Sequence, residues 1–291
     1  MREGQPSRTA IQNALFRALE ARRPASGRVA DDQLAARFLT PEFRLVAGLA
    51  RLPAARRLIE GFIDNRWPCV RGGVVARTRL IDDRVVAELP GVRQVVILGA
   101  GFDSRAYRLP PMRQVTVFEV DHPATQAAKR HVVRREGGES AGRIRFVPVV
   151  FGTDDPAARL ADAGFEPGQP TLVLWEGVTN YLGPEAVEAT FRFLAAALGR
   201  GSPVLFTYVD RGIIDGTARF AGARTTLRAV RRVGEPFTFG LDPGEVAGYL
   251  ADRGFGLEWD TTVSDAAARL YPPGTCPSVP GYYHVAGARR C

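Results

Sequence analysis

The segment Gln94-Val-Val-Ile-Leu-Gly-Ala-Gly-Phe-Asp-Ser-Arg105 passes from an apolar run directly into a glycine-rich turn. An unbroken run of Val, Ile and Leu is typical of a parallel strand that is covered on both faces. Gly99 and Gly101 allow the backbone to turn sharply and to approach a ligand closely. The segment therefore predicts a strand, a ligand-binding turn and a helix, which begin a nucleotide-binding βαβ unit.

The next apolar segment, at 114–120, is followed by an acidic residue at a characteristic spacing. Asp121 lies 22 residues after Gly99. In nucleotide-binding βαβ units, a carboxylate at about this distance accepts hydrogen bonds from ribose hydroxyls. The sequence thus predicts a cofactor that contains a nucleoside, with Asp121 on its ribose.

The residues of the turn distinguish between candidate cofactors. A dinucleotide fingerprint would have a third glycine where this chain has Ser104. A pyrophosphate binds at a helix N-terminus, where Asp103 would repel it. S-adenosylmethionine has no phosphate and carries a sulfonium and an ammonium group besides its carboxylate. The turn therefore favours S-adenosylmethionine, and an NAD(P)-dependent oxidoreductase is the alternative.

Five blocks of sequence follow one another in an order that is itself informative. They are Thr9-Ala10 with Arg17-Ala18, Ala76-Arg-Thr-Arg-Leu-Ile-Asp-Asp83, Leu98-Gly-Ala-Gly-Phe-Asp-Ser-Arg105, Phe118-Glu-Val-Asp-His-Pro123, and Trp175-Glu-Gly-Val-Thr-Asn-Tyr-Leu182. In these blocks the chain resembles the leucine carboxyl methyltransferase family of class I S-adenosylmethionine-dependent methyltransferases, especially its bacterial O-methyltransferase branch. The resemblance implies O-methylation of a carboxylate or hydroxyl group on a small molecule, and its bacterial branch implies a secondary metabolite as the substrate.

The alternation of apolar strands with helices predicts an α/β fold with a doubly wound, mostly parallel sheet. The resemblance implies the Rossmann-like class I methyltransferase fold, with seven strands, N-terminal helices and a lid insertion. Within one structural domain we expect an N-terminal helical cap (1–90), a cofactor-binding core (91–210), a lid insertion (211–240) and the C-terminal part of the core (241–291). Strands are expected at 94–99, 114–120, 143–150, 171–176, 203–209, 255–263 and 281–287. Helices are expected at 31–39, 74–89, 103–108, 122–136, 156–163, 184–198 and 242–253, with Asp242 capping the last.

Composition limits the possible partners. No run approaches the roughly 18 apolar residues of a membrane span, and the N-terminus lacks the apolar core of a signal peptide. Three cysteines are too few and too widely spaced for a metal site. The net charge of +8 comes from scattered arginines rather than from a basic patch. We expect a cytoplasmic protein with no metal that acts on a small-molecule methyl acceptor, not on nucleic acid or membranes; its oligomeric state stays open.

The resemblance assigns cofactor-binding roles to residues in the five blocks. Arg77 would pair with the carboxylate of S-adenosylmethionine, and Arg17 is a weaker candidate for the same group. Gly99 and Gly101 would bring backbone close to the methionine part, and Asp121 would accept hydrogen bonds from both ribose hydroxyls. Glu176 and the backbone of Gly177 would lie beside the ammonium group of S-adenosylmethionine.

One position departs from the family pattern. Val150 stands where the family has an aspartate that reaches the adenine amino group, although Phe151 can still pack on the adenine ring. Asp154 or Asp155 would have to replace the missing acceptor from the following loop. The departure leaves open a second alternative, a protein that binds S-adenosylmethionine without transferring its methyl group.

The acceptor side offers candidates rather than an assigned catalytic residue. Polar side chains near strand ends that can orient an acceptor are Asn180, Tyr181, Tyr208, Asp210 and His284. His284 lies in a terminal strand, which favours a packed side chain. The insertion at 211–240 and the helical N-terminus are predicted to cover the acceptor pocket, exclude water and set specificity. A nucleic-acid methyltransferase would carry an Asn/Asp-Pro-Pro-aromatic motif after the fourth strand, and this chain has none.

Overall fold

Seven strands form one sheet in the computed structural model of the chain, which describes residues 7–135, 143–150 and 153–291. The strand order is β3-β2-β1-β4-β5-β7-β6, with β1 to β5 parallel and β7 antiparallel to both of its neighbours. The strands are β1 (Gln94–Leu98), β2 (Thr116–Asp121), β3 (Ile144–Pro148), β4 (Thr171–Trp175), β5 (Pro203–Val209), β6 (Phe255–Thr262) and β7 (Tyr283–Arg290). The predicted α/β fold with a mostly parallel seven-stranded sheet is confirmed.

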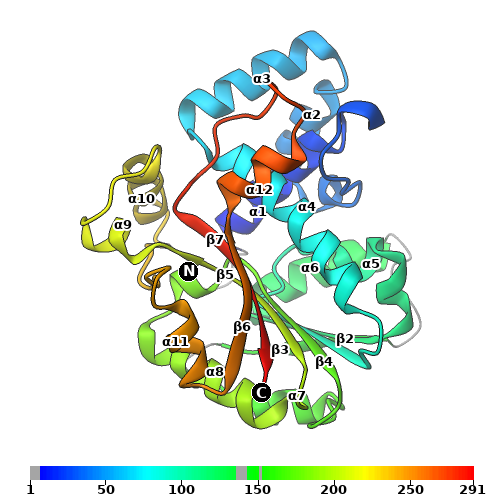
Figure 1. Ribbon diagram of the computed structural model, residues 1–291. Coiled ribbons are helices and arrows are strands. Elements are labelled where there is room, and N and C mark those ends of the chain that lie inside the picture. Colours follow the sequence, from blue (N-terminus) through cyan, green and yellow to red (C-terminus); the bar gives the residue numbers. More distant parts are fainter. Residues whose placement is uncertain (1–6, 136–142, 151–152) are drawn as a thin grey trace.

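Side chains of the central strand alternate between two apolar cores. Val96 and Leu98 of β1 belong to the core beneath α7 (Pro156–Asp162), α8 (Pro184–Ala197) and α11 (Val246–Ala251). Val95 and Ile97 belong to the core beneath α4 (Val70–Glu88), α5 (Arg105–Arg108) and α12 (Val263–Leu270). Helices therefore cover both faces of the sheet, which explains why β1 is apolar from Val95 to Leu98 (Figure 1).

The N-terminal helices form a third apolar core of their own. This core joins α1 (Arg8–Glu20), α2 (Pro41–Leu49), α3 (Pro53–Arg66) and the first turns of α4 to Phe102 of the glycine-rich turn and Val133 of α6 (Pro123–Arg135). Short 3₁₀ turns connect the elements at η1 (Ala25–Gly27), η2 (Ala35–Phe38), η3 (Pro110–Gln114) and η4 (Thr179–Tyr181). The contact with Phe102 holds α1 above the end of β1, at the upper edge of the sheet in Figure 1.

Three predicted helices have different bounds in the structure. At 242–253, the carboxylate of Asp242 accepts a hydrogen bond from the Gly244 amide (2.9 Å), which forms a turn, so α11 begins only at Val246. At 31–39, the Asp32 carboxylate caps only the short η2. The helix expected at 74–89 begins four residues earlier, at Val70. Acidic capping signals predicted the starts at 31 and 242 incorrectly because the same side chains also stabilise turns.

The insertion at 211–240 contains two helices, α9 (Arg211–Asp215) and α10 (Ala223–Arg232), which the sequence pattern did not show. After α10 a turn at 233–234 leads into a segment without helix or strand that runs to Gly240. Its Thr238 amide donates to the carbonyl of Asn180 (2.8 Å) and its Thr238 hydroxyl to that of Leu182 (2.8 Å). Residues 234–238 are thereby fixed beside the end of β4. None of the helices in the described part of the chain is both long and apolar enough to cross a bilayer.

Candidate functional site

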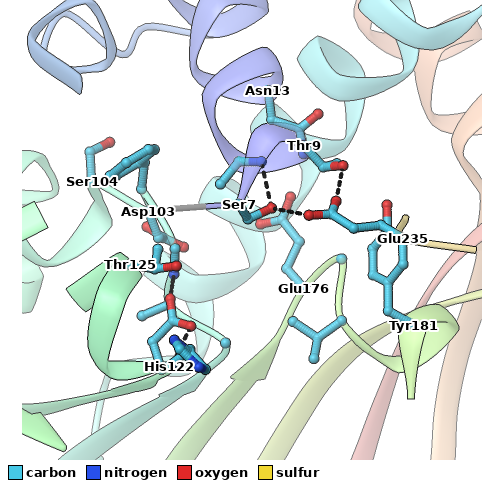
Figure 2. A pocket seen from close by; sticks show the side chains of 18 of the residues that line it. Ser7, Thr9, Asn13, Asp103, Ser104, His122, Thr125, Glu176, Tyr181 and Glu235 are labelled. Atoms are coloured by element: carbon cyan, nitrogen blue, oxygen red, sulfur yellow. Dashed lines mark hydrogen bonds between the residues drawn. The ribbon is translucent and has the colours of Figure 1, made fainter. Parts of the chain in front are cut away.

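A cavity of about 560 Å³ lies at the carboxyl ends of β1, β2 and β4. Its lining comes from the start of α1, from Arg77 on α4, from the glycine-rich turn, from the residues after β2, β3 and β4, and from the segment 234–238. The volume falls within the range of small-molecule sites, and the location is the one expected for a doubly wound sheet. Figure 2 shows two polar ends, one around His122 and Thr125 and the other around Thr9, Tyr181 and Glu235, with Glu176 between them.

The glycine-rich turn forms one wall of the cavity in a backbone conformation that suits glycine. Gly99 has φ +66° and Gly101 has φ +43°, both in the left-handed region. A Cβ atom on Gly99 would lie 2.2 Å from Cγ2 of Val178, which closes the opposite wall. The turn therefore brings bare backbone to the cavity, and the closeness of Gly99 and Gly101 to the methionine part of a cofactor stays a prediction.

Asp121 defines the first polar end of the cavity. Its carboxylate accepts hydrogen bonds from the backbone amides of Gly101 and His122, the latter at 2.6 Å. Burial raises the pKa of Asp121, against the lowering effect of these two amides. An ionised carboxylate has about four acceptor positions, so two remain for the hydroxyl groups of a ligand.

Val150, also at this end, lines the cavity, while Phe151 lies outside the described residues. The expected substitutes for the missing family aspartate do not line the cavity. Asp154 instead accepts a hydrogen bond from the Val150 amide (2.8 Å), and Asp155 caps α7 through the Ala157 amide (2.9 Å). Both carboxylates therefore serve the local backbone.

Glu176 joins three segments in the middle of the cavity. Its two oxygens accept from Arg77 Nε (2.6 Å) and from Arg105 Nη1 (2.6 Å). Burial alone would raise the pKa of Glu176, but the charges of Arg105 and Arg77 outweigh burial and lower it. Glu176 is therefore ionised. In the structure Arg77 uses Nε on Glu176, and its two terminal nitrogens have no hydrogen bond to a described residue, so they are free to bind the carboxylate of a ligand.

Arg105, which also lines the cavity, extends this network along its wall to Asp103 and behind it to Asp82. It binds Asp82 through Nε (2.7 Å) and Asp103 through Nη1 (2.6 Å), and its own side chain is only 4% exposed. Burial opposes ionisation of Asp103, but Arg105 and Lys129 lower its pKa to about 2. Asp82 and Arg105 both lie in family blocks, yet sequence reasoning gave them no role. The signal that could have identified them is a charged residue within a stretch whose neighbouring residues are expected to be buried.

Arg17 also lines the cavity, but two of its three side-chain nitrogens already bind protein groups. Nε pairs with Asp32 (2.8 Å) and Nη2 donates to the carbonyl of Phe102 (2.7 Å). These contacts connect α1 to the glycine-rich turn and to η2. They give Arg17 a role in holding the wall of the cavity, beside the weaker ligand-binding role that the resemblance implied.

The second polar end is built from two segments far apart in sequence. The Ser7 hydroxyl donates to Glu235 Oε1 (3.2 Å), and the Thr9 hydroxyl donates to Glu235 Oε2. Tyr181 lines the cavity beside them and packs edge-on against Phe237, with ring centroids 5.3 Å apart. Burial, together with Tyr283 and Glu235, raises the pKa of Tyr181, so its phenol stays protonated. Sequence reasoning missed Glu235, although it is the only acidic residue within 216–241.

Of the acceptor-side candidates, only Tyr181 lines the cavity; Asn180, Tyr208, Asp210 and His284 do not. Tyr208 and His284 face each other across β5 and β7, stacked with ring centroids 4.7 Å apart. Asp260 on β6 binds both, through the Tyr208 hydroxyl and through His284 Nδ1 at 3.1 Å. Asn180 is fully buried and binds the segment 234–238 through its carbonyl. Asp210 caps α9.

Comparison with known proteins places the chain in a family. The profile of the leucine carboxyl methyltransferase family matches residues 10–195. A protein of Mycolicibacterium gilvum, provisionally named an S-adenosyl-L-methionine-dependent methyltransferase, is 43% identical over 197 residues, which are 64% of this chain and 61% of the relative. A protein of Parafrankia with the same provisional name is 33% identical over 282 residues, which cover 96% of this chain and 86% of the relative.

The chain spans 61% of the M. gilvum relative and about half of two mycobacterial relatives that match it comparably. Among solved structures, a DUF574-family protein of Streptomyces avermitilis has a TM-score of 0.62 at 14% identity, with 96% of this chain and 97% of the other covered. A provisionally named methyltransferase of Thermobifida fusca has a TM-score of 0.59 at 16% identity, with 99% and 96% covered. These two structures share the fold. By the family match and the Parafrankia relative, the chain belongs to the leucine carboxyl methyltransferase family.

Proposed function

We propose that the chain is an S-adenosylmethionine-dependent O-methyltransferase that acts on a carboxylate or hydroxyl group of a small molecule, in bacterial secondary metabolism. The observation that carries the proposal is one continuous cavity. At one end it has a carboxylate with free acceptor positions, in the middle an ionised Glu176 beside Arg77, and at the other end a separate polar group. The relatives, which are named for S-adenosylmethionine-dependent methyl transfer, support the cofactor and the reaction type.

The residues of the cavity suit the parts of S-adenosylmethionine. Asp121 can accept from two ribose hydroxyls, and the apolar Val149 and Val150 offer a surface to the adenine ring. The amino-acid part needs one group of each sign, which Glu176 and Arg77 supply. When bound, S-adenosylmethionine provides a methyl group on a positively charged sulfur, which an oxygen nucleophile can displace.

The chain itself contributes binding, orientation and exclusion of water. The ion pair with Arg105 holds the Glu176 carboxylate in one orientation, in which it can bind the amino-acid part of the cofactor. The start of α1 and residues 234–238 line the cavity opposite the sheet, which limits access of water. Orientation of two reactants in such a site is worth about 7–11 kcal/mol of the barrier. Positioning alone accounts for a large part of the rate in this class of reaction.

The proposal is tested by calorimetric titration with S-adenosylmethionine, S-adenosylhomocysteine and NADH. We expect both sulfur nucleosides to bind and NADH not to bind. Asp121→Ala removes two charge-assisted hydrogen bonds of about 1.5–3 kcal/mol each, which corresponds to affinity roughly 100- to 10,000-fold weaker. Asp162→Ala, an exposed acid at the end of α7, is the matched control and should bind normally.

Three results would contradict the proposal in different ways. Absence of binding by both sulfur nucleosides would leave only a shared fold. Tight binding of NADH would favour the oxidoreductase alternative. Tight binding of S-adenosylmethionine, with no methyl transfer to any carboxylate or hydroxyl compound in a broad panel, would identify a binding protein instead of an enzyme.

A further inference from the structure

Most of the carboxylates that line the cavity have a charged or amide partner, but one has only hydroxyl partners within the residues that the structure describes. Among the described residues, five carboxylates line it: Asp32, Asp103, Asp121, Glu176 and Glu235. Asp32, Asp103 and Glu176 form ion pairs with arginines that line the same cavity. Asp121 accepts backbone amides at the nucleoside end. Glu235 is the remaining one, and in the described part of the chain no basic side chain forms an ion pair with it.

Glu235 is nevertheless held in place. Its oxygens accept one hydroxyl each from Ser7 and Thr9 (Figure 2). The Ser7 oxygen also accepts the Ala10 amide at 3.2 Å, since Ser7 caps α1, and this contact directs the Ser7 proton toward Glu235. A carboxylate has about four acceptor positions, so roughly two stay open toward the cavity. Tyr181, which stays protonated, lies beside them.

This arrangement discriminates between acceptors of different charge. A second carboxylate at contact distance from Glu235 would be repelled by an amount worth roughly a hundredfold to a thousandfold in affinity at the effective dielectric near a protein surface. A neutral hydroxyl group instead donates its proton to an open position on Glu235. The Tyr181 hydroxyl can donate in turn to a lone pair of the acceptor oxygen.

We propose that Ser7, Thr9, Tyr181 and Glu235 form an acceptor subsite for a neutral hydroxyl compound such as a phenol, with Glu235 as the base. The proposal rests on the proposed methyltransferase function and selects the hydroxyl from its two acceptor classes. In the step, the acceptor oxygen forms a bond to the methyl carbon while the carbon–sulfur bond breaks and leaves its electron pair on sulfur. The hydroxyl proton passes to Glu235, which later releases it to solvent, so that the products are an ether and a neutral thioether.

Matched probes test the charge preference without requiring the natural acceptor. Protein saturated with S-adenosylhomocysteine is titrated with 4-propylphenol, 4-propylbenzoate and 4-propylaniline. We expect the phenol to bind at least about tenfold more tightly than the benzoate. In Glu235→Gln this ratio should fall at least about tenfold, chiefly because the benzoate binds better, while the affinity for S-adenosylhomocysteine is unchanged. Glu245→Gln, an exposed glutamate outside the cavity, should behave as wild type.

The rate of methyl transfer to 4-propylphenol distinguishes the effect of the charge of residue 235 from the effect of its position. Loss of a positioned base lowers kcat by about 10²- to 10⁴-fold, and we expect this in Glu235→Gln with a much smaller change in KM. Glu235→Asp keeps the charge but withdraws it from the acceptor. It should retain the discrimination against the benzoate while losing most of kcat.

The proposal is overturned if the benzoate binds as tightly as the phenol, if the aniline binds most tightly, or if Glu235→Gln leaves the ratio unchanged. Failure of all three probes to bind the saturated protein would count equally against it. Failure of S-adenosylhomocysteine itself to bind is a different result, because it would contradict the proposed function and not the choice of acceptor.

Discussion

Replacement of Arg105 by methionine should destabilise the protein more than any surface arginine change. The side chain is 4% exposed and binds three carboxylates, those of Asp82, Asp103 and Glu176. Removal of one partner from a buried ion pair costs about 3–5 kcal/mol. Unfolding entropy of about 2.1 cal/mol/K per residue over 291 residues amounts to about 0.6 kcal/mol/K. The melting temperature of Arg105→Met should therefore fall by about 5–8 °C.

The loss of unfolding free energy in Arg105→Met, relative to wild type, should become smaller as the pH falls. In wild type, the pKa of Asp103 is lowered from 3.8 to about 2, so its ionised form contributes stability above pH 3.8 that is lost between pH 3.8 and 2. A shift of this size is worth roughly 2 kcal/mol. Without Arg105, burial dominates and the folded-state pKa rises above the unfolded value. The variant then regains stability as pH falls from about 7 toward 4.5.

Urea unfolding of both proteins at about pH 7 and pH 4.5 measures this directly. Arg192→Met is the matched control, since Arg192 is 75% exposed and lies 3.6 Å from Glu188; an exposed pair of this kind is worth below about 1 kcal/mol. A deficit for Arg105→Met as small as that of the control would refute the reasoning. So would a deficit that stays constant or grows at the lower pH.

Two further substitutions probe the glycine-rich turn and the interior behind it. Gly99→Ala should lower both stability and affinity for S-adenosylhomocysteine, because its Cβ would lie 2.2 Å from Val178. Gly164→Ala is the control, since Gly164 also has a positive φ but no heavy atom lies within 4 Å of its Cβ. It should lower the free energy of unfolding by only about 1–2 kcal/mol and leave binding unchanged. The Glu119–Lys129 pair (2.8 Å) is buried, with both side chains 1% exposed, and burial raises the pKa of Glu119 to about 7. Lys129→Met alone should cost about 3–5 kcal/mol, whereas Glu119→Gln combined with Lys129→Met should unfold within about 1 kcal/mol of wild type or be more stable. Equal losses in the single and double variants would contradict this expectation.

The strands and the cofactor end of the cavity were predictable because their determinants are local. Buried parallel strands need continuous apolar runs, and each run stands between turn-forming residues in the sequence. Gly99, Gly101 and Asp121 lie within one βαβ unit, so their spacing alone brings them together. The same local logic placed Glu176 at the end of β4.

The end around Glu235, which we propose as the acceptor subsite, was not predictable because its contacts are remote. Ser7 and Glu235 are 228 residues apart, and nothing in either neighbourhood identifies the other. Proximity to a strand end misled for Tyr208 and His284, because antiparallel pairing of β5 and β7 directs both side chains to Asp260 on β6. Alternation along a strand sets the face on which a side chain lies, and the pairing of neighbouring strands sets which side chains lie beside it.

The division of the cavity between two parts of the chain has a consequence for the choice of acceptor. The cofactor end lies within residues 10–195, the range that the family profile matches, whereas Ser7, Thr9 and Glu235 lie outside that range. The proposed acceptor end thus combines Tyr181, inside the matched range, with a helix start and one short segment that lie outside it. Under the proposed function, substitutions confined to Ser7, Thr9 and Glu235 would change the acceptor while the nucleoside end around Asp121 stays intact.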